Sequence, residues 1–162
     1  MQQLNFEQAL HRMAAYCSRV ERCIYDVRKK MDSWEIPKEE QELIILRLKQ
    51  DQFLDESRYC RAFVNDKSKY NRWGIYKIKF ELTKKQIPEN LIREALENSN
   101  PEENTAQLRL LLEQKRKSVK GKNEFEIRQK LMKFAAGRGF SQDEIEKALR
   151  IDPGEACWGQ TY

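Results

Sequence analysis

The chain has 162 residues, which suits one ordinary domain or a short array of small ones and excludes a large multidomain enzyme. Charged residues make up 35% and hydrophobic residues 40%, so helices with one solvated face are favoured over a compact α/β enzyme or a disordered chain. Its 31 Lys and Arg against 26 Asp and Glu leave a net charge of +5, which matters only where it is clustered.

Start and stop signals divide the chain into short helices. Only six Gly and four Pro are present, too few for the turns of an all-β chain. Pro37, Pro88 and Pro101 fit first helical turns, and Asp55 fits an N-cap. The predicted helices cover residues 5–15, 18–34, 37–49, 55–67, 73–86, 88–97, 101–119, 123–136 and 142–150.

Two four-residue segments have the spacing of a capping box, in which a Ser hydroxyl and a Glu carboxylate bind each other's free backbone amides. They are residues 18–21 and 141–144, and they predict helix starts near 18 and 141. Gly137 and Gly139 predict a left-handed helix stop between them.

A spacing of apolar residues recurs three times at intervals of 51 and 53 residues. The trios are Val27, Met31 and Ile36; Ile78, Leu82 and Ile87; and Leu131, Ala135 and Phe140. Beyond the second and third trios, Pro88, Ile92, Ala95 and Leu96 match Ser141, Ile145, Ala148 and Leu149. In the first unit, two extra residues are taken to shift this pattern to Leu43 and Leu46.

Each trio describes a helix, a tight turn and a short capped helix that folds back. Such a unit buries little alone and gains by stacking on its neighbours. We therefore predict an all-α fold of three tandem three-helix repeats that form an elongated, curved array. The repeats would cover residues 1–50, 51–99 and 100–151, followed by a flexible tail at 152–162. The alternative is one irregular bundle with coincidental spacing.

The sequence predicts no cofactor, metal site or membrane segment. Cys17, Cys23, Cys60 and Cys157 form no C-x-x-C pair and His11 has no partner, so the cysteines are interpreted as small buried hydrophobes. The longest apolar run, residues 43–46, is far below the roughly 20 residues that span a bilayer. With no secretory signal at the N-terminus, we expect a soluble cytoplasmic protein.

Positive charge is concentrated in two windows. Residues 58–85 and residues 115–138 each contain nine basic and two acidic side chains, whereas the first 50 residues contain nine and eight. Such clusters attract polyphosphates or acidic protein surfaces, although a solvated face or helix-dipole stabilisation also explains them. The candidate partner-binding or nucleic-acid-binding residues are Arg58, Arg61, Lys69, Arg72, Trp73, Lys77, Lys84, Lys85, Lys115, Arg116, Lys117, Lys120, Lys122, Arg128 and Lys130.

Aromatic residues lie among the lysines of the first window. Tyr76 and Phe80, one helical turn apart, could stack on bases or anchor in a partner, but burial between stacked repeats is the favoured interpretation. Packing and functional roles are equally compatible with Trp73. No phosphate-binding loop or hydrolase motif is present, and the paired carboxylates lie in predicted first helical turns, so the chain is not expected to be an enzyme.

Residues 53–60 (FLDESRYC) and 73–87 (WGIYKIKFELTKKQI) resemble the central pattern of the RecX family of bacterial recombination regulators. Residues 138–141 (RGFS) resemble the arginine-glycine-phenylalanine turn of its third unit, and the resemblance covers about residues 8–150. The chain departs from the family at Gln86, where glycine is expected, at Cys60, where alanine is usual, and around residues 34–36.

The resemblance implies a regulator that binds the RecA recombinase, lies in the groove of its filament on single-stranded DNA and limits filament growth and the dependent ATPase and recombination activities. Some family members also bind single- or double-stranded DNA directly. We expect the protein to be a monomer. The alternative is a sequence-independent helical DNA-binding module without a recombinase partner, for which the basic clusters alone would suffice.

Overall fold

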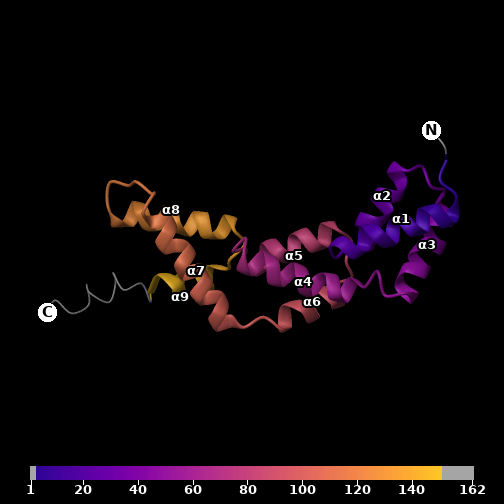
Figure 1. Ribbon diagram of the computed structural model, residues 1–162. Helices are drawn as coiled ribbons and strands as arrows, with labels where there is room; N and C mark the ends of the chain where they lie inside the picture. Colours follow the sequence, from indigo (N-terminus) through magenta and orange to yellow (C-terminus); the bar gives the residue numbers. More distant parts are fainter. Residues whose placement is uncertain (1–2, 151–162) are drawn as a thin grey trace. The chain divides into compact units, whose positions relative to one another are not determined.

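The computed structural model describes residues 3–150, and within them the protein contains nine α-helices and no strand (Figure 1). This confirms the all-α fold. The helices are α1 (Phe6–Arg19), α2 (Ile24–Ser33), α3 (Lys38–Gln50), α4 (Glu56–Lys69), α5 (Ile75–Lys84), α6 (Glu89–Glu97), α7 (Pro101–Arg116), α8 (Glu124–Gly137) and α9 (Gln142–Arg150).

The described residues form two compact units. The first contains the residues up to Phe63 together with Leu82–Ala95, and the second contains Val64–Glu81 together with the residues from Leu96 onward. Both α4 and α5 therefore contribute residues to each unit. The division into repeats at 1–50, 51–99 and 100–151 stays a prediction, and the predicted tail at 152–162 lies outside the described residues.

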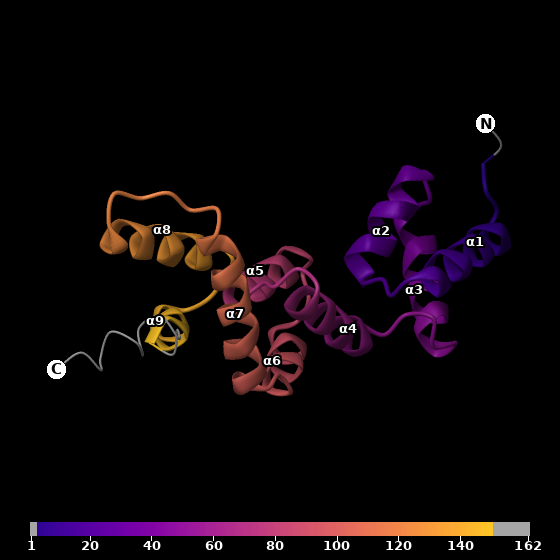
Figure 2. The same ribbon diagram turned by 60° about the vertical axis from the view of Figure 1, so that its left-hand side comes forward.

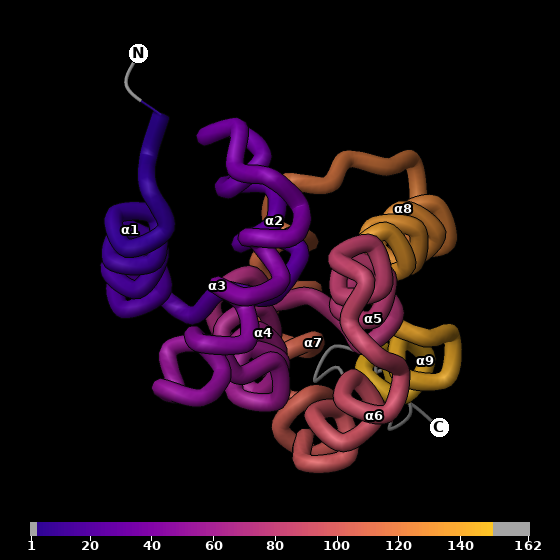
Figure 3. Tube along the Cα trace, turned by 90° about the vertical axis from the view of Figure 1, so that its right-hand side faces the viewer, coloured from indigo at the N-terminus to yellow at the C-terminus, as the bar shows by residue number. Residues whose placement is uncertain are grey.

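Each unit has its own apolar core. In the first unit, α1, α2 and α3 bury a continuous cluster, and Figure 3 follows the chain through these three helices. Its members are Ala9, Met13, Cys17, Val27, Met31, Ile36, Ile44, Ile45, Leu48 and Leu54. In the second unit, α7, α8 and α9 share a cluster of Leu108, Leu111, Leu112, Leu131, Ala135, Phe140, Ile145, Ala148 and Leu149.

The turn after each middle helix confirms the repeat. In α2, α5 and α8 the N–H of the third residue of the trio donates to the carbonyl oxygen of the second, which closes the helix in a Schellman motif. The donor and acceptor pairs are Ile36 and Met31 at 3.1 Å, Ile87 and Leu82 at 3.3 Å, and Phe140 and Ala135 at 3.3 Å. All nine residues of the three trios are buried.

The residue before the third trio member has a left-handed backbone in every repeat. The φ angles are +57° at Glu35, +58° at Gln86 and +96° at Gly139. Gln86, which stands where the family resemblance expects glycine, thus keeps the geometry of the turn. It does so at the conformational cost that a side chain incurs in this region.

The first repeat corrects one detail of the predicted pattern. Leu43 and Leu46 are 56% and 53% exposed, whereas Ile44 and Ile45 are buried, so no residues are inserted after Pro37. The predicted shift was wrong because a polar side chain, Gln41, occupies the position of Ile92 and Ile145.

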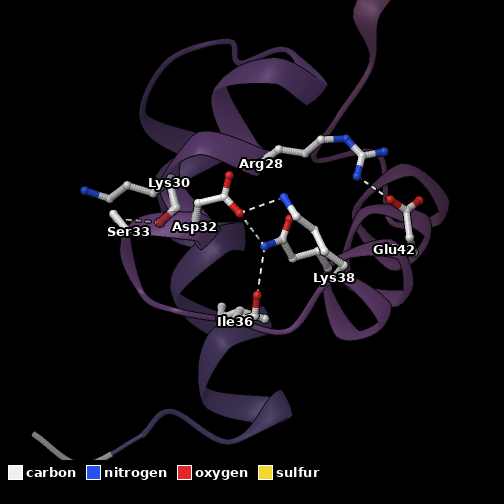
Figure 4. A network of polar contacts seen from close by, with 8 residues as sticks. Arg28, Lys30, Asp32, Ser33, Ile36, Lys38 and Glu42 are labelled. Carbon is white, nitrogen blue, oxygen red and sulfur yellow. Dashed lines mark hydrogen bonds and ion pairs between the residues drawn. The ribbon is translucent and has the colours of Figure 1, made fainter.

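Gln41 is fully buried, and its side-chain nitrogen is hydrogen-bonded, whereas its Oε1 accepts no hydrogen bond from the described residues. Its Nε2 donates to Asp32 Oδ1 and to the Ile36 carbonyl, both at 2.8 Å. Figure 4 shows Asp32, at the end of α2, also facing Lys38 at the start of α3, where the Nζ–Oδ1 distance is 2.9 Å. Polar contacts therefore join α2 to α3.

The prediction that a helix starts near residue 18 was wrong. Helix α1 continues to Arg19, and the Ser18 hydroxyl donates to the Ala15 carbonyl at 2.9 Å instead of capping a helix. Helix α2 begins at Ile24, after Cys23. The reason is tertiary: Ala9, Met13 and Cys17 form one buried stripe that extends α1 beyond the predicted end.

Other predicted caps are confirmed. The Ser141 hydroxyl accepts from the Glu144 N–H at 3.2 Å, and the Glu144 carboxylate accepts from the Ser141 N–H at 2.8 Å. Asp55 accepts from the Arg58 N–H at 3.1 Å. Pro101 is the first residue of α7, whereas Pro37 and Pro88 directly precede α3 and α6.

Cys17, Cys23 and Cys60 are buried, as predicted, while Cys157 lies outside the described residues. Burial raises the pKa of Cys17 and Cys60 to about 11 and that of Cys23 to about 12. These three side chains therefore remain neutral thiols at neutral pH.

The start of α5 contacts the turn after α8 within the second unit. The Gly74 N–H donates to the Arg138 carbonyl at 2.8 Å, and the Tyr76 N–H donates to the Gly139 carbonyl at 3.0 Å. A Cβ atom at Gly74 would lie 2.4 Å from the Gly139 carbonyl, and one at Gly139 would lie 2.4 Å from Lys77 Cβ. Only glycine permits this approach of the two backbones.

Candidate partner and nucleic-acid interface

The segment 67–80, here called the α4–α5 surface, joins the end of α4 to most of α5 and belongs entirely to the second unit. It carries five basic side chains and no acidic one. Three of its aromatic side chains are exposed: Tyr70 by 81%, Tyr76 by 63% and Phe80 by 61%. Exposed aromatic groups among cations are typical of interaction surfaces.

The burial predicted for Tyr76 and Phe80 was wrong. On a helix these residues lie one turn apart on the same side, and Ile78 and Leu82 lie on the opposite, buried side. The core therefore covers the Ile78 and Leu82 side of α5, and Tyr76 and Phe80 face outward.

Trp73 lies half-buried between two lysines. The Lys67 ammonium is 4.8 Å and the Lys77 ammonium 4.6 Å from the centre of the Trp73 ring, which are cation–π distances. The ring also lines a small cavity with Gly74, Ile78 and Phe140. Trp73 thus packs in the second unit and also positions two cations of the α4–α5 surface.

Arg72 helps to fix the shape of this surface. Its backbone is left-handed with φ +54°, and the next residue, Trp73, donates its N–H to the Lys67 carbonyl at 3.0 Å. Its guanidinium Nη1 donates to Gln114 Oε1 on α7 at 2.9 Å. Lys69, by contrast, is exposed at the end of α4.

Two of the candidate residues form ion pairs within the first unit. Arg58 Nε lies 2.5 Å from Glu21 Oε1, and its Nη2 donates to the Gln52 carbonyl at 3.0 Å. Lys85 Nζ lies 2.5 Å from Asp26 Oδ1. The structure therefore gives Arg58 and Lys85 a role in holding α4 and the end of α5 to the first repeat.

The remaining candidates of the first window, Arg61 and Lys84, are exposed in the first unit. Arg61 Nη1 donates to Ser57 Oγ one turn earlier on α4 at 3.0 Å. Neither side chain belongs to the α4–α5 surface.

The Asp26–Lys85 ion pair should make the free energy of unfolding depend on pH. Burial alone would raise the pKa of Asp26, but hydrogen bonds from Lys85 and Cys23 lower it below its ordinary value. Burial alone would likewise lower the pKa of Lys85, but its bond to Asp26 raises it. The stabilisation is thus lost in acid as pH falls through the native pKa of Asp26, and in alkali as pH rises through that of Lys85.

We expect Lys85→Met to lower the free energy of unfolding by about 1–2 kcal/mol at pH 7, a value reduced for the partial exposure of Lys85. The deficit should shrink in acid, as pH falls through the native pKa of Asp26, because the protonated carboxyl group no longer forms an ion pair with Lys85. Urea unfolding at neutral and at acidic pH measures this, with Lys29→Met, an exposed lysine on α2, as the control. If the stability loss of Lys85→Met did not depend on pH, the Asp26–Lys85 ion pair would not be its cause.

The second window forms the end of α7, a loop and the start of α8, here called the basic hairpin (residues 115–130). Lys115 Nζ lies 4.8 Å from the centre of the Phe134 ring, and Arg116 Nη2 lies 2.6 Å from Glu124 Oε2. Lys130 Nζ donates to the Lys120 carbonyl at 2.5 Å. Lys117, Lys120 and Lys122 are exposed in the loop, and Arg128 is half-buried on α8.

Phe125 is a feature of this hairpin that sequence reasoning missed. It lies on the first turn of α8 and is 70% exposed. Its position three residues after Lys122 was visible in the sequence, but no pattern distinguished an exposed ring from a buried one there.

The two units differ in charge. The described part of the second unit carries 17 basic and 11 acidic side chains and contains both the α4–α5 surface and the basic hairpin. The described part of the first unit carries 14 basic and 13 acidic side chains. The excess positive charge of the described residues thus belongs almost entirely to the second unit.

Within residues 3–150, no helix combines the length and apolar character needed to cross a membrane. The same residues contain no group of three or more His, Cys, Asp or Glu side chains placed to hold a metal ion.

Two family models match the chain: the second three-helix domain of RecX matches residues 55–96, and the third matches residues 102–149. The chain also matches curated relatives that are named regulatory protein RecX, of which three are described. The match to the protein of Clostridium acetobutylicum is 27% identical and covers 90% of this chain and 69% of the relative. The match to the protein of Halalkalibacterium halodurans is 30% identical and covers 93% of this chain and 55% of the relative. The match to the protein of Prosthecochloris aestuarii is 28% identical and covers 88% of this chain and 91% of the relative.

Solved structures agree with this assignment. A crystal structure of regulatory protein RecX superposes with a TM-score of 0.83 at 26% identity and covers 89% of this chain and 72% of that one. The fold is also that of RecX from Lactobacillus salivarius, with a TM-score of 0.78 at 22% identity over 90% of this chain and 94% of that one. The matched domain models, the regulatory relatives and the shared helical repeat array together show that this chain belongs to the RecX family.

Proposed function

We propose that this protein binds the RecA recombinase filament on single-stranded DNA and inhibits filament extension, ATP hydrolysis and recombination. The relatives are named as regulatory proteins, and the sequence resembles a family of recombination regulators. One observation supports the location of the contact: the α4–α5 surface exposes aromatic and cationic side chains inside the segment that matches the second RecX domain.

The chemistry of the α4–α5 surface suits a protein partner with an acidic face. Tyr76 and Phe80 offer two rings one helical turn apart, as aromatic anchors do at the centres of interfaces. Lys69, Arg72 and Lys77 belong to the same segment and add positive charge, which would orient an acidic partner surface as it binds.

The repeat architecture supports binding to a polymer rather than to a single subunit. Successive three-helix repeats can each contact a different recombinase protomer, and several modest contacts on one chain raise avidity for the filament. We propose that the protein acts in this way as a cytoplasmic monomer, by binding and not by catalysis, and without a cofactor.

The test is DNA-dependent ATP hydrolysis by RecA in the presence of substoichiometric amounts of this protein. We expect hydrolysis to fall, and the suppression to persist when single-stranded DNA is added in excess, because the target is the filament. Unchanged hydrolysis with this protein in excess would count against the proposal.

The alternative is a DNA-binding module without a recombinase partner, and the charge excess of the second unit favours it as the second candidate. A DNA-binding module would suppress hydrolysis only by occupying DNA. Added single-stranded DNA would then restore the ATPase rate fully, and the affinity for DNA would fall steeply with salt.

A further inference from the structure

Helix α3 buries one side and leaves two leucines in water on the other. It packs against α1 and α2 within the first unit (Figure 2). Gln41, Ile45 and Leu48 are buried on its inner side. At about 100° per residue, Leu43 and Leu46 lie on the opposite side of the helix, where they are 56% and 53% exposed. Two adjacent apolar side chains of α3 are therefore available to a partner.

Two polar residues extend this row of side chains by one turn at each end. Glu39 precedes Leu43 by four residues, and Gln50 follows Leu46 by four residues. Both are exposed. Spacings of four, three and four residues are those of the a and d positions along which helices pack in a coiled coil. We call Glu39, Leu43, Leu46 and Gln50 the α3 seam.

The charges that flank the α3 seam change sign along the helix. Glu40 and Glu42 lie near the start of α3, and Arg47 and Lys49 lie near its end. The helical period places Glu40 and Arg47 beside one edge of the seam, and Glu42 and Lys49 beside the other. Each edge of the seam therefore has an acidic half and a basic half.

These flanking charges have free capacity for a partner. Glu40 and Lys49 form no ion pair with any of residues 3–150. Glu42 pairs with Arg28, and Arg47 Nε lies 3.0 Å from Asp51 Oδ2, but more than half of the Glu42 and Arg47 side chains stays exposed. Exposed pairs of this kind contribute little stability, so both groups can take a second partner.

A second α3 helix in the antiparallel direction is complementary to the seam. In a pair with two-fold symmetry, Leu43 of each copy packs against Leu46 of the other. At the two ends, Glu39 of one copy lies opposite Gln50 of the other, and the amide can donate to the carboxylate. The apolar centre and the polar ends of the seam thus both meet suitable groups.

The flanking charges favour the same direction. An antiparallel pair places Glu40 of one copy near Arg47 of the other along one edge, and Glu42 near Lys49 along the other edge. A parallel pair would instead place Glu39 against Glu39 and the acidic halves side by side, which is unfavourable. The outer face of α3 is therefore self-complementary in the antiparallel direction.

We propose that the α3 seam binds a second copy of this chain and forms a symmetric, antiparallel pair of α3 helices. A single pair of short helices buries less than the roughly 1,200 Å² of a standard interface, so the pairing is weak, with a dissociation constant of about 10–500 µM. The pairing goes beyond the function proposed above, which needs only single copies. At the lower concentrations that suppress RecA, the protein is a monomer.

Sedimentation equilibrium of the full chain from about 10 µM to about 1 mM measures the pairing. The mean mass of the wild-type protein should rise towards that of a dimer. Leu43→Ser with Leu46→Ser should weaken the pairing at least about 10-fold, because apolar surface is no longer buried. Both side chains are exposed, so circular dichroism should show unchanged helicity. Leu110→Ser on α7 is the matched control, since Leu110 is also 53% exposed, and should pair as the wild type does.

Charge reversal tests the antiparallel register separately. Glu40→Lys with Glu42→Lys makes both halves of the flanking edges basic, and Arg47→Glu with Lys49→Glu makes both halves acidic. Each variant alone should pair at least about 10-fold more weakly than the wild type, because like charges then face each other. An equimolar mixture of the two variants should form a one-to-one heterodimer at least as tight as the wild-type pair, because opposite charges again face each other.

The proposal is overturned if the wild-type protein stays monomeric at about 1 mM, or if Leu43→Ser with Leu46→Ser pairs as tightly as the wild type. It is also overturned if the two charge-reversed variants keep their helicity and do not associate when mixed. Because RecA is absent from these measurements, such a failure leaves the suppression of RecA ATPase untouched. Conversely, an unchanged ATPase rate would leave the pairing result standing.

Discussion

Gly139→Ala should lower the free energy of unfolding by roughly 3 kcal/mol, the largest stability loss that we expect from a single methyl group in this protein. Gly139 has φ +96°, which side chains rarely adopt, and the new Cβ would lie 2.4 Å from both Lys77 Cβ and Lys77 N. The start of α5 would have to move away from the turn after α8, which breaks the hydrogen bond from Tyr76 to Gly139.

Gly137→Ala is the matched control for this measurement. Gly137 is the last residue of α8, two positions earlier, and an added Cβ would have nothing within 4 Å. Because alanine is the better helix former, this variant should be as stable as the wild type or more stable by up to about 1 kcal/mol. Equal urea midpoints for Gly139→Ala and Gly137→Ala would contradict the close approach of the two backbones.

Removal of both exposed rings from α5 should weaken filament inhibition without harm to the fold. For the double variant Tyr76→Ser and Phe80→Ser, we expect the concentration that halves RecA ATPase activity to rise at least about 10-fold, because central aromatic anchors each contribute about 1–2 kcal/mol or more. Thermal unfolding should change little, since both side chains are over 60% exposed.

Leu43→Ser with Leu46→Ser provides the control for this second prediction. These two apolar side chains are also one turn apart on a helix and have similar exposure, at 56% and 53%, but they lie on α3 in the first unit. The control should inhibit RecA as the wild type does. If it lost inhibition to the same extent as the α5 variant, the α4–α5 surface would not be the specific contact.

The repeat could be predicted from sequence because its spacing determines both the buried face of a helix and the turn that follows the helix. Apolar residues four and then five positions apart place Ile78 and Leu82 on one helix face and Ile87 after the turn, and the same spacing in α2 and α8 gave the same Schellman turn. The caps at Asp55 and Ser141 were predictable because capping bonds span only three residues.

Features that depend on distant partners could not be predicted in this way. Ser18 had the spacing of a cap, but the buried stripe of α1 extends as far as Cys17 and keeps Ser18 inside that helix. Arg58 and Lys85 looked like free cations because their acidic partners lie 37 and 59 residues away in the chain. Which side of α5 would be covered depended on the packing around Ile78 and Leu82, so the exposure of Tyr76 could not be read from its neighbours.

Co-sedimentation with preassembled RecA filaments measures whether the protein binds the filament itself. We expect the wild-type protein to pellet with filaments at salt concentrations where it does not pellet with DNA alone. The Tyr76→Ser and Phe80→Ser double variant should stay in the supernatant, while the Phe125→Ala variant should still pellet. A wild-type protein left in the supernatant, or an α5 double variant that pellets as fully as the wild type, would contradict binding of the filament through the α4–α5 surface.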